Sequence, residues 1–264
     1  MMYPTDPRTA PGSTLYAARP AEISPAEWRA RVDLAAAYRL ASRHGWDDQI
    51  YTHISLRVPD RDNAYLMNPY GFRFEEITAS NLLLVDTLGN VIDGTNRRGN
   101  PTGFAIHGAV HNARSDAHCV MHLHNDAIIA VGALKQGLLP LSQHAMRFWN
   151  HISYHEYEGL ALSAAEQSRL LASLGDNAAM FLRNHGSLTC GRTVAEAYVL
   201  MFDLDKSCMT QLAAMAASDQ LIQPSDDVLR QTQANLALGP TPDGELEWAS
   251  LLRKLLREEP DFNT

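Results

Sequence analysis

The segment Cys119-Val120-Met121-His122-Leu123-His124 is a short apolar run that carries two histidines. Its length and apolar character predict a buried strand. Residues i and i+2 of a strand point to the same face of the sheet, so His122 and His124 can bind one ion.

A second segment brings another histidine to the end of a strand. Residues 178–182 form an apolar run, and Arg183-Asn184-His185-Gly186 follows it, with a glycine that permits a sharp turn. Three imidazoles with an open coordination position suit catalytic zinc, and they also suit iron, copper or nickel. The alternative is a metal-free pair in the core or on the surface. We predict a metal site made of His122, His124 and His185.

The composition limits the class of protein. The chain has 264 residues, 45% of them hydrophobic, which is enough for one large core. A net charge of -8 without a basic patch argues against a nucleic-acid partner. The three cysteines, Cys119, Cys190 and Cys208, are widely separated, which predicts reduced, buried thiols in a cytoplasmic protein. The first 20 residues lack the apolar core of a signal peptide, and the longest apolar stretch is too short for a membrane span.

Strand and helix patterns alternate around the histidine strand. We expect helices at 25–44, 102–114, 126–136, 164–174 and 194–217, and strands at 50–58, 65–68, 82–86 and 178–182. This order predicts an α/β fold with helices on the faces of a mixed sheet and metal ligands at strand ends.

Three regions are expected along the chain: an irregular N-terminal arm (1–23), the α/β domain (24–217) and a C-terminal helical tail (218–264). The last helix of the tail carries a narrow apolar stripe of Trp248, Leu251, Leu252 and Leu255. The stripe requires a partner, either the protein's own core or a neighbouring subunit.

Three motifs, in this order and spacing, resemble the class II aldolase/adducin family. They are Phe104-Ala105-Ile106-His107-Gly108-Ala109-Val110-His111, the segment 119–124, and Arg183-Asn184-His185-Gly186-Ser187-Leu188. The resemblance covers roughly residues 27–215. It implies a three-layer α/β/α fold with a central mixed, largely antiparallel sheet, and a homotetramer with active sites at subunit interfaces. It also implies a divalent ion, Zn²⁺ first and Fe²⁺ as the alternative, on the three histidines.

The departures from the sugar-phosphate aldolases concern their acid/base and their phosphate site. Gly103 stands where those enzymes have a glutamate. Their Gly-Asn-x-Ser motif and Ser/Thr-Gly turn are replaced by Thr52-His53-Ile54-Ser55 and Asn68-Pro69-Tyr70-Gly71. The bulkier residues disfavour a sugar phosphate, so we expect a small carboxylate or oxo acid. Four arginines could neutralise it, unless they are solvated surface residues: Arg57, Arg73, Arg147 and Arg183.

The expected chemistry follows from the ion. Neutral imidazoles leave the ion its full charge, so it would polarise a carbonyl and stabilise an adjacent enediolate or carbanion. A proton carrier is also needed, and we predict His155 first and Tyr154 second, although their stretch could be only a strand and turn with a solvated face. His107 and His111 are expected behind the ligands or in the core.

Three functions remain open. The first is a divalent-metal-dependent carbon–carbon lyase that cleaves or decarboxylates a non-phosphorylated oxo or hydroxy acid. The second is a non-haem Fe(II) oxygenase that oxidatively decarboxylates an aromatic 2-oxo acid, as in relatives from antibiotic pathways that share a three-histidine site without the glutamate. The third is a non-catalytic binding module like the adducin head, which keeps the fold without the metal histidines.

Overall fold

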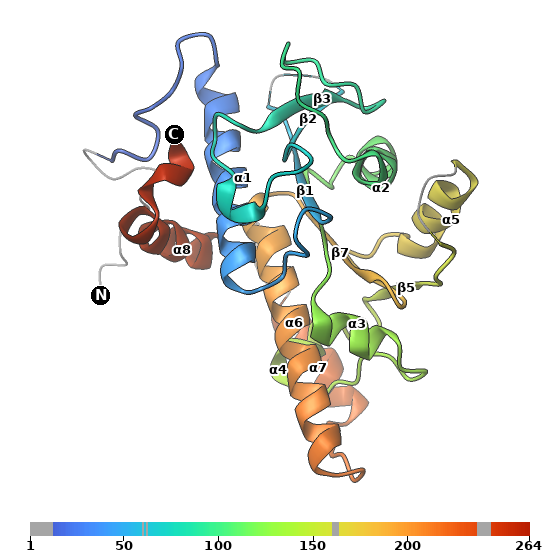
Figure 1. Cartoon of the computed structure of the whole chain (residues 1–264). Helices are drawn as coiled ribbons and strands as arrows, with labels where there is room; N and C mark the ends of the chain where they lie inside the picture. Colours follow the sequence, from blue (N-terminus) through green and yellow to red (C-terminus); the bar gives the residue numbers. More distant parts are fainter. Residues whose placement is uncertain (1–12, 60, 62, 160–163, 237–243) are drawn as a thin grey trace.

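A seven-stranded sheet forms the centre of the protein (Figure 1). A computed structural model describes residues 13–59, 61, 63–159, 164–236 and 244–264. The strands are β1 (His53–Arg57), β2 (Ala64–Met67), β3 (Leu83–Asp86), β4 (Cys119–Leu123), β5 (Ser153–His155), β6 (Ala179–Leu182) and β7 (Gly186–Gly191). Their order is β3-β2-β1-β4-β7-β6-β5, and every neighbouring pair is antiparallel except β5 and β6. The predicted mixed, largely antiparallel sheet is confirmed, and the histidine strand β4 lies at its middle.

Helices cover both faces of the sheet, which gives the predicted α/β/α layers. They are α1 (Pro25–Arg43), α2 (Pro101–Ala113), α3 (Asp126–Gly132), α4 (Gln143–Met146), α5 (Ala164–Leu174), α6 (Val194–Ala217), α7 (Asp226–Leu236) and α8 (Glu245–Glu258), with short 3-10 turns η1 (Phe74–Glu76) and η2 (Pro260–Asn263). One face packs against α1, α3 and α6, and the other packs against α2 and α5.

Local signals begin and end the two long helices. The Oγ atom of Ser24 accepts the backbone N–H of Glu27 at 3.1 Å, and Pro25 takes the first helical position of α1. Gly45, at φ 67°, ends that helix in the left-handed region. Thr193 caps α6 in the same way as Ser24 caps α1. The serine predicted to cap α5, Ser163, lies outside the described residues.

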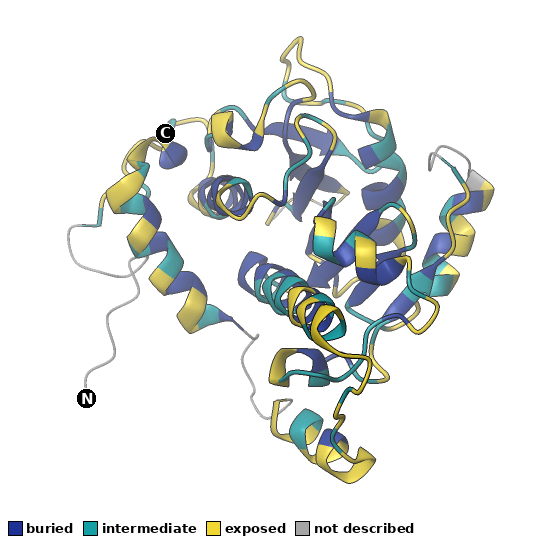
Figure 2. Ribbon diagram, turned by 60° about the horizontal axis from the view of Figure 1, so that its bottom comes forward, coloured by how far each residue is buried: buried dark blue, intermediate teal, exposed yellow. Residues whose placement is uncertain are grey.

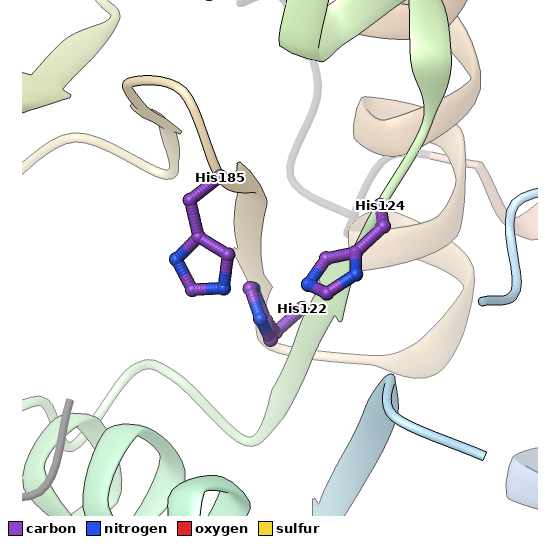
Figure 3. A group of neighbouring side chains, drawn as sticks. All are labelled: His122, His124 and His185. Atoms are coloured by element: carbon purple, nitrogen blue, oxygen red, sulfur yellow. The ribbon is translucent and has the colours of Figure 1, made fainter. Parts of the chain in front are cut away.

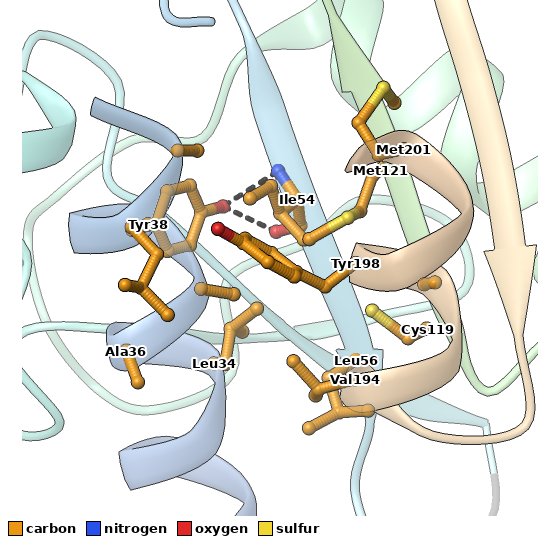
Figure 4. Close-up of a cluster of buried hydrophobic side chains, with 14 of the residues drawn as sticks. Leu34, Ala36, Tyr38, Ile54, Leu56, Cys119, Met121, Val194, Tyr198 and Met201 are labelled. Carbon is orange, nitrogen blue, oxygen red and sulfur yellow. Dashed lines mark hydrogen bonds between the residues drawn. The ribbon is translucent and has the colours of Figure 1, made fainter. Parts of the chain in front are cut away.

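The larger core lies between α1, α6 and the sheet (Figure 4). Leu34 and Tyr38 of α1 meet Ile54 and Met121 of the sheet and Tyr198 of α6, and all five are at most 2% exposed. The Tyr38 hydroxyl donates to the carbonyl of Ile54 and accepts its N–H. This contact fixes α1 against β1, the strand next to the histidine strand.

The C-terminal helix α8 packs on the same core. Trp248, Leu252 and Leu255 are at most 1% exposed, and the Trp248 ring lies 5.5 Å from that of Tyr198 between centroids. Figure 2 shows α8 with a buried inner side and an exposed outer side. Of the two partners expected for the apolar stripe, the structure selects the protein's own core.

One predicted helix is shorter than expected. The helix after β4 ends at Gly132 instead of residue 136. The Nη1 atom of Arg183 donates to the carbonyls of Gly132 and Leu134, at 2.7 and 3.0 Å, and so satisfies backbone groups that a longer helix would use itself.

The cysteines agree with the prediction, since Cys119, Cys190 and Cys208 are all buried and free. Within the described ranges, no helix has the length and apolar character that crossing a bilayer requires.

Candidate metal centre

Two neighbouring strands bring the three histidines together (Figure 3). His122 belongs to β4, and His124 follows directly after that strand. His185 lies in the tight turn between β6 and β7, where Asn184 adopts φ 58°. Because β7 pairs with β4, this turn lies beside the end of the histidine strand.

Gly186 allows the turn to approach β4 closely. A Cβ atom at this position would lie 2.6 Å from the carbonyl oxygen of Leu123 and 2.9 Å from Cδ2 of His124. The sequence predicted a glycine for a sharp turn. The structure shows that Asn184 supplies the left-handed residue and that Gly186 supplies the space.

The candidate ligand atoms form a compact donor set. One ring nitrogen from each of His122, His124 and His185 lies within 4.8 Å of the other two. Nδ1 of His122 lies 2.9 Å from the carbonyl oxygen of Ser187, and Nδ1 of His124 lies 3.0 Å from a carboxylate oxygen of Asp48. Both partners only accept, so the Nδ1 atoms carry the protons and the Nε2 atoms keep their lone pairs.

The environment of these imidazoles fits a metal ion. Nε2 of His124 is buried and has no hydrogen-bond partner. Burial, followed by neighbouring imidazoles, lowers the pKa of His122 well below its usual value and that of His185 to about 4. Neutral imidazoles are the form that ligates Zn²⁺ or Fe²⁺, and an unpartnered buried nitrogen is what an ion would satisfy.

Of the two predicted proton carriers, His155 lies nearer to the three histidines. It lines a small pocket of about 10 Å³, room for about one water molecule, together with His185, Tyr157 and Arg183. Its Nδ1 lies 3.0 Å from the Ser173 hydroxyl, whereas its Nε2 is buried without a partner.

Tyr154 points to the other face of β5. Its hydroxyl accepts the N–H of Leu138 at 2.9 Å, and its ring stacks on Phe181 at 5.1 Å between centroids. The Tyr154 side chain therefore supports the fold beside α3 and lies apart from the His155 pocket.

The four candidate arginines all have partners within the protein. Arg57 donates to the carbonyl of His111, and Arg183 donates to two carbonyls and pairs with Glu156. The other two form ion pairs, Arg147 with Asp203 and Arg73 with Glu75. An acidic substrate would have to share these cations with the fold.

Two residues next to the ligands, Asp48 and His53, were not predicted as site residues. Asp48 orients His124, and His53 is the direct cross-strand partner of His122, with ring centroids 5.0 Å apart. Their positions depend on β1 lying beside β4. The available signal was His53-x-Ser55, whose alternate positions put both side chains on one face.

Sequence and fold comparisons with known proteins show the family of this chain. Residues 32–212 match the family described as Class II Aldolase and Adducin N-terminal domain. A Caulobacter vibrioides protein whose name places it in aldolase class 2, without giving a substrate, is 48% identical over 91% of this chain and 94% of its own. The crystal structure of an aldolase II superfamily protein from Pseudomonas syringae is 44% identical, with a TM-score of 0.88 over 92% of this chain and 98% of that one.

The similarity extends to the adducins. Alpha-adducin of Rattus norvegicus is 35% identical over 85% of this chain, a match that spans 32% of the adducin. The family model alone covers more than half of the sequence. The chain belongs to the class II aldolase and adducin family.

Proposed function

We propose that this protein is a divalent-metal-dependent carbon–carbon lyase that cleaves a non-phosphorylated oxo or hydroxy acid. The main observation in support of this proposal is the state of His124: its Nε2 is buried without a hydrogen-bond partner, while Asp48 fixes its Nδ1. His122 is fixed in the same tautomer by the Ser187 carbonyl. The two hydrogen bonds fix the rings through Nδ1, so that Nε2 is the nitrogen that each ring offers to an ion.

The bound ion, Zn²⁺ in this proposal, would polarise a substrate carbonyl and stabilise negative charge on the adjacent carbon. The chain's own residues orient the ligands and move protons. Nε2 of His155 is free to carry a proton in the pocket that it shares with His185. The Ser173 hydroxyl holds the other nitrogen of His155 and so orients the ring.

The substrate proposed is a small carboxylate or oxo acid. Bulky side chains replace the small residues that a phosphate cradle needs: Thr52 and His53 in one stretch, Pro69 and Tyr70 in the other. We further propose a cytoplasmic homotetramer. Three buried, free thiols support a reducing compartment, and the class II resemblance supports the assembly.

Two measurements test this function. Metal analysis of protein purified without added metal is expected to find one Zn²⁺ per chain. The zinc-loaded protein is expected to release an aldehyde from 4-hydroxy-2-oxo acids without oxygen. Stoichiometric iron with substrate-dependent oxygen uptake would replace the lyase with the Fe(II) oxygenase.

A binding module is the second candidate, because this chain is similar to alpha-adducin over 85% of its length. That function requires no ion at the three histidines. A protein that binds neither zinc nor iron and that cleaves none of the acids would favour it over the lyase.

A further inference from the structure

Behind the three histidines, a buried hydrogen-bonded chain joins β1 to α2. It contains His53 and Ser55 of β1 and His107 and His111 of α2, and all four are at most 2% exposed. Nδ1 of His53 lies 2.8 Å from Nε2 of His107, and the Ser55 hydroxyl contacts Nδ1 of His107. The same hydroxyl lies 2.7 Å from Nε2 of His111, whose Nδ1 lies 3.0 Å from the carbonyl oxygen of Ala117.

The contact between His111 and Ala117 fixes which atom donates in each of these hydrogen bonds. The Ala117 carbonyl only accepts, so Nδ1 of His111 carries the proton and its Nε2 accepts from Ser55. The Ser55 oxygen then accepts the Nδ1 proton of His107, whose Nε2 accepts the Nδ1 proton of His53. Burial lowers the pKa of His111 to about 3 and that of His107 well below its usual value, which agrees with one proton on each ring.

This series of hydrogen bonds therefore leaves Nε2 of His53 with a lone pair. His53 pairs directly with His122 across β1 and β4, so its side chain lies on the same face of the sheet as the metal ligand. It is absent from the group of three histidines whose nitrogens lie within 4.8 Å of one another. Its lone pair is thus positioned next to the ion site and outside the ligand set.

Gly103 makes room for this ring. A Cβ atom at position 103 would lie 2.9 Å from Cδ2 and 3.2 Å from Nε2 of His53. Any larger residue at position 103 would force the imidazole away. Gly103 therefore has two effects: α2 carries no carboxylate at this position, and the His53 ring has the space beside it.

We propose that His53 takes the proton from the substrate hydroxyl during carbon–carbon cleavage at the three-histidine centre, a role that rests on the lyase function proposed above. For a 4-hydroxy-2-oxo acid, the C4 hydroxyl loses its proton to Nε2 of His53, the C3–C4 bond breaks, and C4 leaves as an aldehyde. The bond's electron pair passes to the 2-oxo group as an enolate, and His155 supplies the proton that C3 needs. Solvent then takes one proton from His53 and returns one to His155. Ser55, His107 and His111 are positioning residues that fix the tautomer of His53.

The first test separates metal binding from cleavage in His53→Asn, whose amide can still donate to His107. With 4-hydroxy-2-oxopentanoate as substrate, we expect one zinc per chain and a kcat at least about 100-fold lower than in the unchanged protein. Loss of zinc from His53→Asn would make His53 a fourth ligand and overturn the proposal. Unchanged kcat would overturn it as well. The matched control is His144→Asn, an exposed histidine on α4.

A half-reaction separates this role from the lyase function itself. Exchange of the pyruvate methyl protons with D2O involves no hydroxyl, so zinc-loaded His53→Asn should keep it, whereas His155→Asn should lose it. If His53→Asn loses exchange as well as cleavage, the assigned role is wrong. If the unchanged zinc protein performs neither reaction, the lyase function fails, and the His53 proposal fails with it.

The tautomer of His53 can be measured without a substrate. Nitrogen-15 NMR of the metal-free protein should show His53 protonated at Nδ1 and unprotonated at Nε2, and the opposite tautomer would refute the assigned hydrogen-bond directions.

A milder change tests the space that Gly103 provides. Gly103→Ala should lower kcat with zinc retained, because its Cβ displaces the His53 ring. In Gly108→Ala, on the same helix, the added Cβ lies 3.3 Å from the Thr87 carbonyl oxygen and 3.8 Å from the Tyr65 hydroxyl and does not contact His53, so this variant should lower kcat less than Gly103→Ala. Equal activity of the two alanine variants would contradict the role of Gly103.

Discussion

Acid should destabilise the metal-free protein through its buried imidazoles, and His111 allows the size of the effect to be calculated. Burial lowers its pKa from 6.5 to about 3 in the folded protein. Between these values the unfolded chain binds more protons than the folded one, so the free energy of unfolding falls as the pH falls. From pH 7 to pH 5 the unfolded imidazole becomes almost fully protonated while the folded one stays neutral. The loss from His111 alone is about 2 kcal/mol.

Urea unfolding of the EDTA-treated protein at pH 7 and pH 5 measures this loss. His111→Gln removes one titrating group, so its stability should fall by about 2 kcal/mol less over this interval than that of the unchanged protein. His144→Gln is the matched control, because an exposed imidazole meets solvent in both states. An identical pH dependence in the unchanged protein and in His111→Gln would refute the reasoning.

Three further predictions concern the ligands and the packing of α8. His185→Ala should abolish stoichiometric zinc binding by metal analysis while circular dichroism stays unchanged, since His185 lies in a turn; full occupancy would contradict its role as a ligand. Asp48→Asn should weaken zinc affinity about 10- to 100-fold in a chelator competition, because the carboxylate that accepts the Nδ1 proton of His124 is lost; equal affinity would remove Asp48 from the site. Leu252→Ala should lower the free energy of unfolding by about 2–5 kcal/mol in urea, whereas the exposed Leu246→Ala should change it little; similar values for both would mean that α8 is not part of the core.

Elements with strong periodicity could be predicted from the sequence. The helix expected at 194–217 is observed as α6 with the same bounds, because a capping threonine and a regular apolar stripe define it. β7 was missed, since Gly-Ser-Leu-Thr-Cys-Gly shows neither alternation nor a continuous apolar run. The strand nevertheless pairs with β4 on one edge and β6 on the other, and all its residues are buried.

The candidate site also has a part that local sequence predicts and a part that depends on strand order. His122 and His124 are two residues apart in one strand, so their shared face follows from local geometry alone. The contact between His124 and Asp48 joins residues 76 positions apart, and it depends on β1 lying beside β4. Nothing in the local sequence states that strand order, and for the same reason His53 was treated only as a bulky replacement.

The position of β4 has a consequence for the order in which the protein would fold and take up the proposed ion. β4 is hydrogen-bonded on both edges, to β1 and to β7, and its residues Cys119, Val120 and Met121 are fully buried. A strand held in this way forms with the core, so we expect the ligands to be arranged before any ion arrives. Metal insertion would then be a late step on a folded chain, unlike a zinc finger, whose folding waits for its metal. A cell could load, empty or exchange the ion without unfolding the protein.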